Sequence, residues 1–320
     1  MSPLIECVPN FSEGRDQTVI DAIVSAIRRE GVQVLHTDRG EGANRTVVTF
    51  AGPPDAVCEA AFRGAETAAR LIDMRRHHGA HPRLGATDVL PLIPLRDISL
   101  ETCAGLAREL AARMYRELGI PCYCYEAAAL RAPFRKLEAC RAGEYEALGR
   151  KIADPALRPD FSPDTLTPTA QRTGGSIVGA RNFLVAVNFN LATADKDLAM
   201  EIARDVRESG RVAGGVRIKG RLPGCKAIGW YIEEYGIAQV SMNITDIDRV
   251  TMTDAFREVS RCARRRGTRV TGTELIGLVP LRALPPETVG ELRLDDLRPF
   301  DPRKKVIEYL LEDAGTLPHA

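Results

Sequence analysis

Three of the chain's five histidines, His77, His78 and His81, lie within five positions. The surrounding segment, Arg75–Ala86, contains two glycines and a proline, which predicts a loop rather than a continued helix. Loops on a rigid scaffold often carry catalytic residues. Because imidazole titrates near neutral pH, a histidine in this loop could move protons during a reaction.

The residues alone leave three interpretations of this cluster open. The first is a metal site, because His77 and His81 stand four apart, the spacing that places two ligands on one helix face; Gly79 and Pro82 argue against a helix there. The second is loop hydrogen bonding, which suits His77 and His78. The third is acid–base catalysis by His81, because Pro82 restricts the backbone of His81 and helps to hold its ring.

Two other polar segments could contribute to a site. Asp38–Arg45 is predicted as a turn between two strands. That turn either carries solvated charges or brings Asp38 and Arg45 to strand ends that face a cleft. Asn10–Gly14 is predicted as a turn before a helix, where it either caps the helix or offers backbone N–H groups to an anion.

The elements that must position these residues alternate between strand and helix patterns. Strands are predicted at residues 4–8, 32–35, 46–50, 89–94 and 121–125 in the first half, and at 183–189, 227–232, 237–242 and 268–273 in the second. Helices are predicted at 53–72 and 100–118, and apolar residues at helical spacing predict others at 20–27, 198–206 and 252–263.

Each half contains the order β-α-β-β-α-β, which is the ferredoxin-like arrangement. We therefore predict an α/β (α+β) protein with two ferredoxin-like subdomains, residues 1–180 and 181–320. The proline-rich segment 126–181 is predicted as a long connection, with the subdomain boundary near Gly179. We expect each sheet to leave an apolar face, and we expect the two sheets to pack face to face across a cleft.

The composition narrows the class of protein. Lys and Arg number 44 against 43 for Asp and Glu, so the charge balance supports neither a nucleic-acid-binding nor a membrane-surface protein. No secretory signal opens the chain, and no apolar run reaches the roughly 18 residues that span a bilayer. The eight cysteines form no C-x-x-C pair, which argues against a zinc knuckle, and Cys122 and Cys124, on one face of a predicted strand, are expected to be free thiols. These features predict a cytoplasmic protein.

Several segments of the chain resemble the formiminotransferase family, the transferase half of the bifunctional formimidoyltransferase-cyclodeaminases. They run in the family's order along nearly the whole chain: Val8–Gly14, Asn44–Val47, Leu71–Met74, His81–Arg83, Gly85–Ala86, Arg141–Leu148, Pro159–Phe161, Gly179–Arg181, Gly229–Tyr231 and Gly277–Leu281. The resemblance implies two α/β subdomains. It also implies transfer of a formimidoyl group from N-formimidoyl-L-glutamate to N5 of tetrahydrofolate, a step of histidine degradation.

The resemblance also assigns residues. The family's catalytic histidine lies in its H-P-R motif, which is His81 here, and its folate-binding stretch follows P-D-F. That stretch comprises Ser162, Pro163, Asp164, Thr165, Leu166, Thr167, Pro168, Thr169, Ala170, Gln171, Arg172, Thr173 and Gly174. It is longer than we expect, and Gln171–Thr173 looks inserted. No helical cyclodeaminase domain follows, so we expect a separate protein to deaminate the product.

The remaining assignments follow from the chemistry of the two substrates. The formimidoyl group is cationic near neutral pH, so a carboxylate would stabilise it, and Asp38 is the candidate. Arginine pairs with carboxylates through two parallel hydrogen bonds, which suits Arg45, Arg83 and Arg181 to the carboxylates of glutamate and folate. Asn10 and Asn44 complete the predicted substrate-binding set. No metal is required.

Three alternatives stay open at this point. The first is formyl transfer from N-formylglutamate, because C=NH₂⁺ and C=O differ mainly in charge. The second is a folate-binding protein without turnover. The H-P-R motif at His81 argues against it, because a protein that only binds folate does not need a group that moves protons at neutral pH. The third is a metal-dependent amidohydrolase using the histidine cluster. The sequence leaves the oligomeric state open, a homodimer included.

Overall fold

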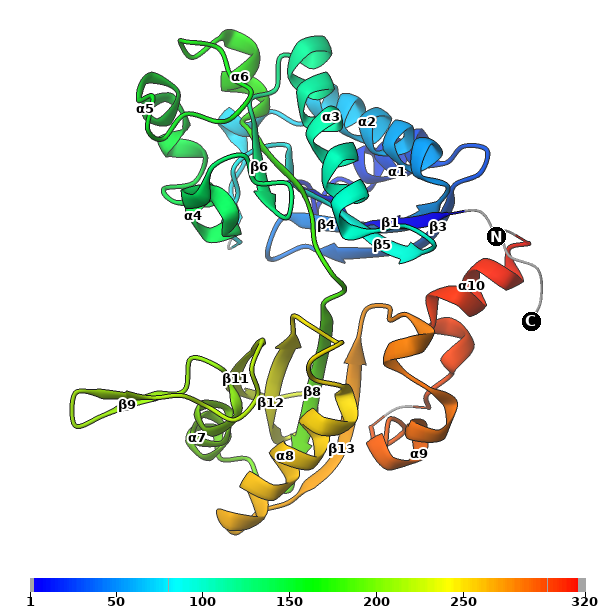
Figure 1. Cartoon of the computed structure of the whole chain (residues 1–320), viewed down its shortest axis with the longest axis vertical. Helices are drawn as coiled ribbons and strands as arrows, with labels where there is room; N and C mark the ends of the chain where they lie inside the picture. Colours follow the sequence, from blue (N-terminus) through cyan, green and yellow to red (C-terminus); the bar gives the residue numbers. More distant parts are fainter. Residues whose placement is uncertain (1–2, 80, 298, 316–320) are drawn as a thin grey trace. The chain divides into compact units, whose positions relative to one another are not determined.

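The computed structural model describes residues 3–79, 81–297 and 299–315. The chain divides into two compact units, residues 1–181 and 182–320, and each unit has its own main sheet (Figure 1). The units are described separately below. Within the described residues, no helix combines the length and the apolar character needed to cross a membrane.

The first unit is built on a seven-stranded sheet. Its strands are β1 (Leu4–Cys7), β2 (Asn10–Phe11), β3 (Gln33–Gly40), β4 (Arg45–Gly52), β5 (Thr87–Arg96), β6 (Cys122–Glu126) and β7 (Ser176–Ala180). β4 pairs with β3 on one side and with β1 and β2 on the other, and β5 completes this antiparallel part. This is ferredoxin-like strand order, and it confirms the prediction. β7 and β6 extend the sheet in parallel beyond β5.

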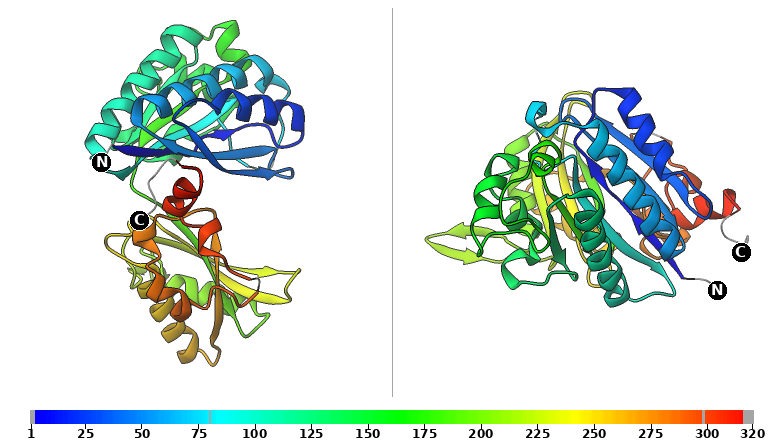
Figure 2. Two further views of the ribbon diagram at one scale, coloured as in Figure 1. Left: turned by 90° about the vertical axis from the view of Figure 1, so that its right-hand side faces the viewer. Right: turned by 90° about the horizontal axis from the view of Figure 1, so that it is seen from above.

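Three long helices cover one face of this sheet (Figures 1 and 2). They are α1 (Gln17–Ile27), α2 (Pro54–Leu71) and α3 (Leu100–Leu118). Asp16 caps α1 by accepting hydrogen bonds from the first-turn amides, and Gly119 ends α3 in the left-handed conformation. Apolar side chains such as Phe11, Phe50 and Leu90 fill the space between helices and sheet.

A second, smaller layer covers β5, β6 and β7 from the opposite face. It contains α4 (Leu137–Arg141), α5 (Leu148–Ala153) and α6 (Pro168–Thr173); a 3₁₀ turn (Tyr145–Ala147) leads into α5, and residues 154–167 connect α5 to α6. Its core includes Tyr123, Phe134 and Ile177. The segment expected to be a plain connection is therefore an ordered layer.

The sequence prediction missed β7. The run Ser176–Ala180 lies inside the sheet between β5 and β6, so Gly179 belongs to a strand and not to a linker. A parallel strand buried on both faces has no alternating pattern, which is why periodicity did not reveal it. A Cβ on Gly179 would lie 2.4 Å from the Tyr125 ring, so only glycine allows this close approach.

Two predicted turns in the first unit are also shorter than expected. Asp38, Arg39 and Gly40 belong to β3, and Arg45 opens β4, so the turn is confined to residues 41–44. Asn10 and Phe11 form β2 rather than a turn. Strand pairing extended these elements into polar residues that carry no strand signal of their own.

The second unit is a four-stranded antiparallel sheet with two main helices. Its strands are β8 (Val185–Leu191), β11 (Cys225–Ile232), β12 (Ile237–Ile244) and β13 (Val270–Ile276), in the order β11-β12-β8-β13. The helices α7 (Lys196–Val206) and α8 (Met252–Arg265) supply the connections, which confirms the ferredoxin-like order here too. The short helices α9 (Val289–Leu292) and α10 (Ile307–Asp313) follow.

A small hairpin in the second unit was not predicted. It consists of β9 (Arg211–Ala213) and β10 (Val216–Ile218), joined by Gly214 and Gly215. Both glycines have positive φ, as a tight two-residue hairpin turn requires. The Gly-Gly pair between two short apolar segments was the signal that could have revealed it.

The sheet faces turned away from the long helices are more polar than expected. In the first unit Arg45 shares that face with Thr49, Asp38 and Asn10, according to strand alternation and register. In the second unit the equivalent face carries a hydrogen-bonded network that includes Asn188, Asn190, Gln239, Glu274 and Trp230. The expectation of two apolar faces is therefore wrong, because polar side chains alternate with the core residues along these strands.

Candidate active site

His81 lies in the loop between a 3₁₀ turn (Met74–Arg76) and β5. Its Nδ1 is 2.6 Å from the Pro82 carbonyl oxygen, and its Nε2 is 2.7 Å from Nη1 of Arg45. A carbonyl can only accept and a guanidinium can only donate, so Nδ1 carries the proton and Nε2 presents a lone pair. His81 is therefore a neutral imidazole held in one tautomer.

The surroundings favour this neutral form. Burial lowers the pKa of His81, and the positive charges of Arg45 and, more weakly, Arg141 lower it further, whereas the Pro82 carbonyl and Asp88 act in the opposite direction. The net effect holds the pKa below the ordinary histidine value of about 6.5. At neutral pH this histidine is thus a base rather than a cation.

A β-bulge places a buried carboxylate close to this base. β2 pairs Asn10 with Val89 but Phe11 with Thr87, which leaves Asp88 as an extra residue in β5. Asp88 is 1% exposed; it accepts hydrogen bonds from the Leu84 amide at 2.7 Å and from Arg141 at 2.6 Å.

Sequence reasoning missed both Asp88 and Arg141. Burial raises the pKa of Asp88, and Arg141 opposes this shift. The available signal was one aspartate inside the otherwise apolar run of β5, because charged residues are seldom fully buried unless they are paired.

Arg45 links His81 to the polar face of the sheet. It opens β4 on the same face as Asp38, which pairs with Val47 in the neighbouring strand. Burial lowers the pKa of Arg45, and the charges of Asp88 and Asp38 counter that effect. The Nε of Arg45 is buried and has no hydrogen-bond partner among the described residues.

Asn44 and His77 hold the loop in place. Asn44 adopts a positive φ of 48°; its side chain accepts from the Gly14 amide and donates to the His78 carbonyl. His77 is buried, and its Nε2 donates to the Asn44 carbonyl at 2.9 Å. The His77 ring thus makes the loop hydrogen bond expected of it, whereas His78 takes part through its backbone carbonyl. Ala80, next to His81, lies outside the described residues.

Arg83 already has carboxylate partners within the protein. Its guanidinium bonds to Glu146 through both terminal nitrogens, at 2.6 and 2.8 Å, and to Glu144 at 3.0 Å. It also lies over the Tyr145 ring. The side chain therefore fastens the His81 loop to the segment after α4, and its bidentate edge is occupied.

The predicted folate stretch meets the His81 loop at its C-terminal end. The Ala86 amide donates to the Thr173 carbonyl at 2.7 Å, and the Gly175 amide donates to the Leu84 carbonyl at 3.1 Å. Residues 168–173 form α6, capped by Thr167, so the apparently inserted residues are its last turn. The first part of the stretch is more exposed, and Asp164 pairs with Arg158 at 2.6 Å.

The other two predicted substrate ligands lie at different places along β5. Asn10 lies opposite Val89 beside the bulge; its Nδ2 donates to the Val8 carbonyl, and its buried Oδ1 has no partner among the described residues. The Arg181 amide donates to the Leu92 carbonyl, four residues along β5 from Asp88. At the rise of a strand this is roughly 13 Å from the bulge.

The described residues contain no group of three or more His, Cys, Asp or Glu side chains placed to hold a metal ion. Both ring nitrogens of His81 and Nε2 of His77 are already hydrogen-bonded. The eight cysteines are unbridged in this structure, and Cys122 and Cys124 are both buried.

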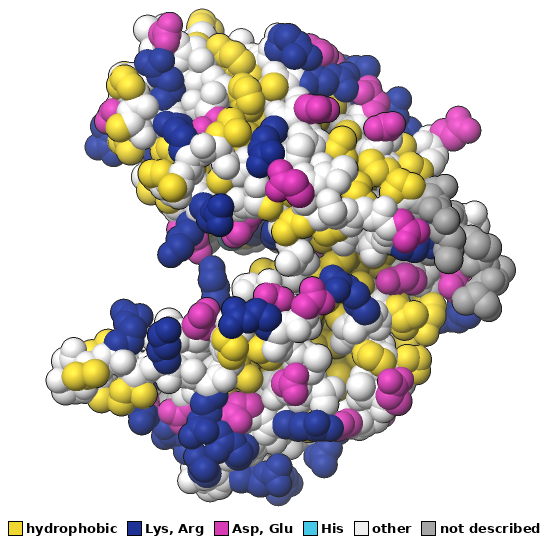
Figure 3. Space-filling model, in the orientation of Figure 1, with side chains coloured by type: hydrophobic (Ala, Val, Ile, Leu, Met, Phe, Trp, Pro, Cys, Tyr) yellow, Lys and Arg dark blue, Asp and Glu magenta, His cyan; other side chains and the backbone are white. Residues whose placement is uncertain are grey.

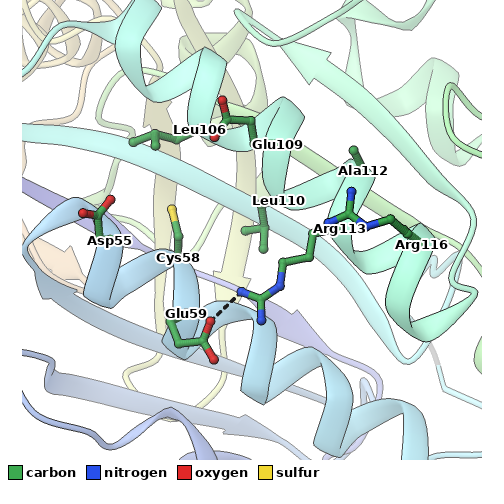
Figure 4. Close-up of a pocket in the computed structure, with 9 residues that line it drawn as sticks. All are labelled: Asp55, Cys58, Glu59, Leu106, Glu109, Leu110, Ala112, Arg113 and Arg116. Carbon is green, nitrogen blue, oxygen red and sulfur yellow. Dashed lines mark hydrogen bonds and ion pairs between the residues drawn. The ribbon is translucent and has the colours of Figure 1, made fainter.

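A cavity of about 450 Å³ lies elsewhere in the first unit, between α2 and α3 (Figure 4). Cys58, Glu59, Leu110 and Arg113 are among its lining residues, and Glu59 bonds to Arg113 across it. None of the predicted site residues lines it. It lies in the helical layer, away from the polar sheet face that carries Arg45.

Fold and site together define an α/β protein of two ferredoxin-like units, the first of which carries a histidine, His81, held as the neutral imidazole. The family description "Formiminotransferase domain, N-terminal subdomain" matches residues 4–181, and "Formiminotransferase domain" matches residues 186–287. The chain belongs to the formiminotransferase family.

Named relatives support the same assignment. The chain is 43% identical to a formimidoyltransferase-cyclodeaminase of Rattus norvegicus, over 98% of this chain and 61% of that protein. It is 40% identical to a glutamate formimidoyltransferase of Streptococcus pyogenes serotype M1, over 96% of this chain and 98% of that protein. A glutamate formimidoyltransferase of Thermoplasma acidophilum is 38% identical over 88% and 89% of the two chains. The chain thus spans about three fifths of the bifunctional relatives it matches.

Proposed function

We propose that this protein transfers the formimidoyl group from N-formimidoyl-L-glutamate to N5 of tetrahydrofolate, giving 5-formimidoyltetrahydrofolate and L-glutamate. The names of the relatives supply the reaction class. The observation that carries the proposal is the neutral His81, held in one tautomer with Nε2 as the basic nitrogen.

The reaction needs one proton to move between two nitrogens. The N5 lone pair attacks the formimidoyl carbon, and the C=N electron pair moves onto the terminal nitrogen to give a tetrahedral centre. His81 Nε2 takes the proton from N5. It then donates that proton to the glutamate nitrogen; the C–N bond to glutamate breaks, and the terminal nitrogen re-forms its double bond to carbon. One group that titrates near neutrality can perform both transfers.

The charges around His81 suit the two substrates. Asp38 is our candidate for stabilising the cationic formimidoyl group. Arg45 is our candidate for a substrate carboxylate, in preference to Arg83, whose carboxylate-binding edge is taken by Glu146. We assign the folate to the stretch 162–174, whose end is hydrogen-bonded to the His81 loop. Asn10 completes this set, and Arg181 would have to bind a more distant part of a substrate.

The cellular context is part of the proposal. The bifunctional relatives are named for both formimidoyl transfer and cyclodeamination, so we propose that a cyclodeaminase consumes the product in histidine degradation. We place the reaction in the cytoplasm, within one-carbon metabolism. No metal is assigned a role.

The test is an assay for release of L-glutamate from N-formimidoyl-L-glutamate, with and without tetrahydrofolate. We expect release that depends strictly on tetrahydrofolate, together with formation of a 5-substituted folate. N-Formyl-L-glutamate is the matched alternative donor, and we expect it to react much more slowly, because it lacks the cationic group that Asp38 would stabilise. Release without tetrahydrofolate would indicate a hydrolase and would contradict the proposal.

A further inference from the structure

The basic nitrogen of His81 is occupied in this structure. Nη1 of Arg45 lies 2.7 Å from Nε2, and the only role a guanidinium can take in that contact is donor. The lone pair that must take a proton from N5 therefore already accepts a hydrogen bond. Before His81 can act as a base, the Arg45 N–H has to leave Nε2.

Within the part of the chain that the structure describes, a nitrogen of Arg45 lacks a hydrogen-bond partner, and a ligand that binds this nitrogen could draw the guanidinium away from His81. Its Nε is buried without a hydrogen-bond partner among the described residues. A carboxylate can bind Nε and a terminal nitrogen together, through two parallel charge-assisted hydrogen bonds. Such a pair is stronger than the single bond to a neutral imidazole, because both partners are charged.

The neighbouring strand offers a second unfilled position. Asn10 lies opposite Val47 on the sheet face that Arg45 occupies, and it is 6% exposed. Its Oδ1 is buried without a partner. A buried donor and a buried acceptor on one face suit a ligand that bears a carboxylate next to an N–H group.

We propose that Arg45 is a latch on the His81 base, and that the α-carboxylate of the formimidoylglutamate donor opens it. The inference rests on the proposed function, because it assumes that His81 works at the formimidoyl carbon. In this donor the α-carboxylate is attached to the carbon that bears the reacting nitrogen. The folate carboxylates lie beyond the aminobenzoyl group, too far from N5 to reach a side chain that touches His81.

The latch makes base strength depend on the donor. When the α-carboxylate takes the guanidinium, Nε2 loses a hydrogen-bond donor and a positive neighbour is neutralised. Both changes favour protonation of His81. The other charged groups that act on His81 or Arg45 are Arg141, Asp88 and Asp38. Because Arg141 and Asp88 are paired with each other, we expect their combined effect on the pKa of His81 to stay the same when Arg45 moves.

The experiment follows the titration of His81 in the intact protein. The protein is labelled with ¹³C in the histidine rings, and the His81 signal is assigned by its loss in His81→Gln. Titrations are recorded alone, with saturating L-glutamate, and with L-isoglutamine, in which the α-carboxylate is an amide. We expect L-glutamate to raise the midpoint by roughly one pH unit, the size of effect that a nearby charge produces, and L-isoglutamine to leave it unchanged.

Two variants sharpen the result. Arg45→Gln should raise the midpoint in the free protein and remove the response to L-glutamate. Arg116→Gln removes one positive charge from the exposed end of α3 and should behave like the unchanged protein. An unmoved His81 midpoint in L-glutamate, or an equal response to L-isoglutamine, overturns the latch even if Arg45→Gln does not fold.

The same measurements separate the latch from the proposed reaction. If L-glutamate shifts His81 but formimidoylglutamate is not consumed, Arg45 still responds to the α-carboxylate, and the proposed transfer reaction fails. If the transfer proceeds while the His81 midpoint does not move, the latch alone is overturned.

Discussion

Burial and two hydrogen bonds give His81 one tautomer and a lowered pKa, the properties that its proposed role as a base requires. The Pro82 carbonyl selects the tautomer, Arg45 keeps Nε2 unprotonated, and burial lowers the pKa. His78 is three residues away in the same loop, yet it is exposed and contributes its backbone carbonyl to Asn44. Neighbouring histidines of one loop thus have different chemistry, which depends on their contacts rather than on their residue type.

Replacement of His81 by alanine should remove most of kcat while leaving the affinity for folate nearly intact. General acid–base catalysis typically contributes on the order of 10²–10⁴-fold, so we expect a loss of that size. Steady-state kinetics with both substrates measures it. His78→Ala is the matched control and should retain nearly full activity; a His81→Ala protein with more than about a tenth of normal kcat would contradict the assigned role.

The pH dependence of activity should show the lowered pKa of His81. In the proposed reaction the neutral imidazole is the active form, so kcat/KM should be constant above this pKa and fall as the pH drops through it. Because burial and Arg45 lower the pKa, the acid limb should lie below pH 6.5, about the value of an unperturbed histidine. Arg45→Gln should move the acid limb to higher pH. An acid limb at or above pH 6.5 in the unchanged protein would contradict the lowering of the His81 pKa by burial and Arg45.

At the scale of elements, the site depends on the contact between the His81 loop and the end of α6. Gly85 and Gly174 face each other there in an isolated bridge. A Cβ on Gly85 would lie 2.2 Å from the Gly175 carbonyl oxygen, and one on Gly174 would lie 2.3 Å from the Leu84 carbonyl oxygen. Gly174 also has a φ of +69°. Two glycines therefore permit the backbone approach that connects the candidate base to the predicted folate stretch.

Gly174→Ala should destabilise the protein and weaken folate binding. The added methyl group would collide with the backbone of Leu84 across the bridge. Overpacking of this kind costs roughly 1–3 kcal/mol of folding free energy. Gly105→Ala in α3 is the control, because a Cβ there meets nothing within 4 Å, and alanine should stabilise the helix by about 0.5–1 kcal/mol. Chemical denaturation and KM for tetrahydrofolate test both variants. Equal stability of the two variants would show that the close backbone approach at the Gly85–Gly174 bridge does not require glycine.

At the scale of the whole molecule, every residue of the candidate site belongs to the first unit, and the second repeats the ferredoxin-like order. Charges of both signs are mixed over the surface that Figure 3 shows, in keeping with a net charge of +1.

Activity of the whole protein should survive removal of divalent metals. The ring nitrogens of His81 are engaged by Arg45 and Pro82, and His77 bonds to Asn44, so the cluster that suggested a metal site is already hydrogen-bonded. The measurement is glutamate release after dialysis against a chelator, with metal content determined on the same sample. Loss of activity that zinc restores would revive the amidohydrolase interpretation.

The amino-acid sequence by itself predicted the repeated β-α-β-β-α-β order and the long helices, because these depend on local periodicity. It singled out the loop that contains His81, but the residues left three interpretations of that loop open, and the catalytic role of His81 stays a prediction. It did not predict β7, whose buried parallel pairing has no alternating signature, nor the pairing of Asp88 with Arg141, which are 53 residues apart in the chain. Arg83 had the right residue type for a carboxylate, yet the fold supplies Glu144 and Glu146 to it. Which charged side chains pair depends on their proximity in three dimensions. Only the tertiary structure therefore showed that Arg83 binds carboxylates of the protein itself, whereas Arg45 contacts His81.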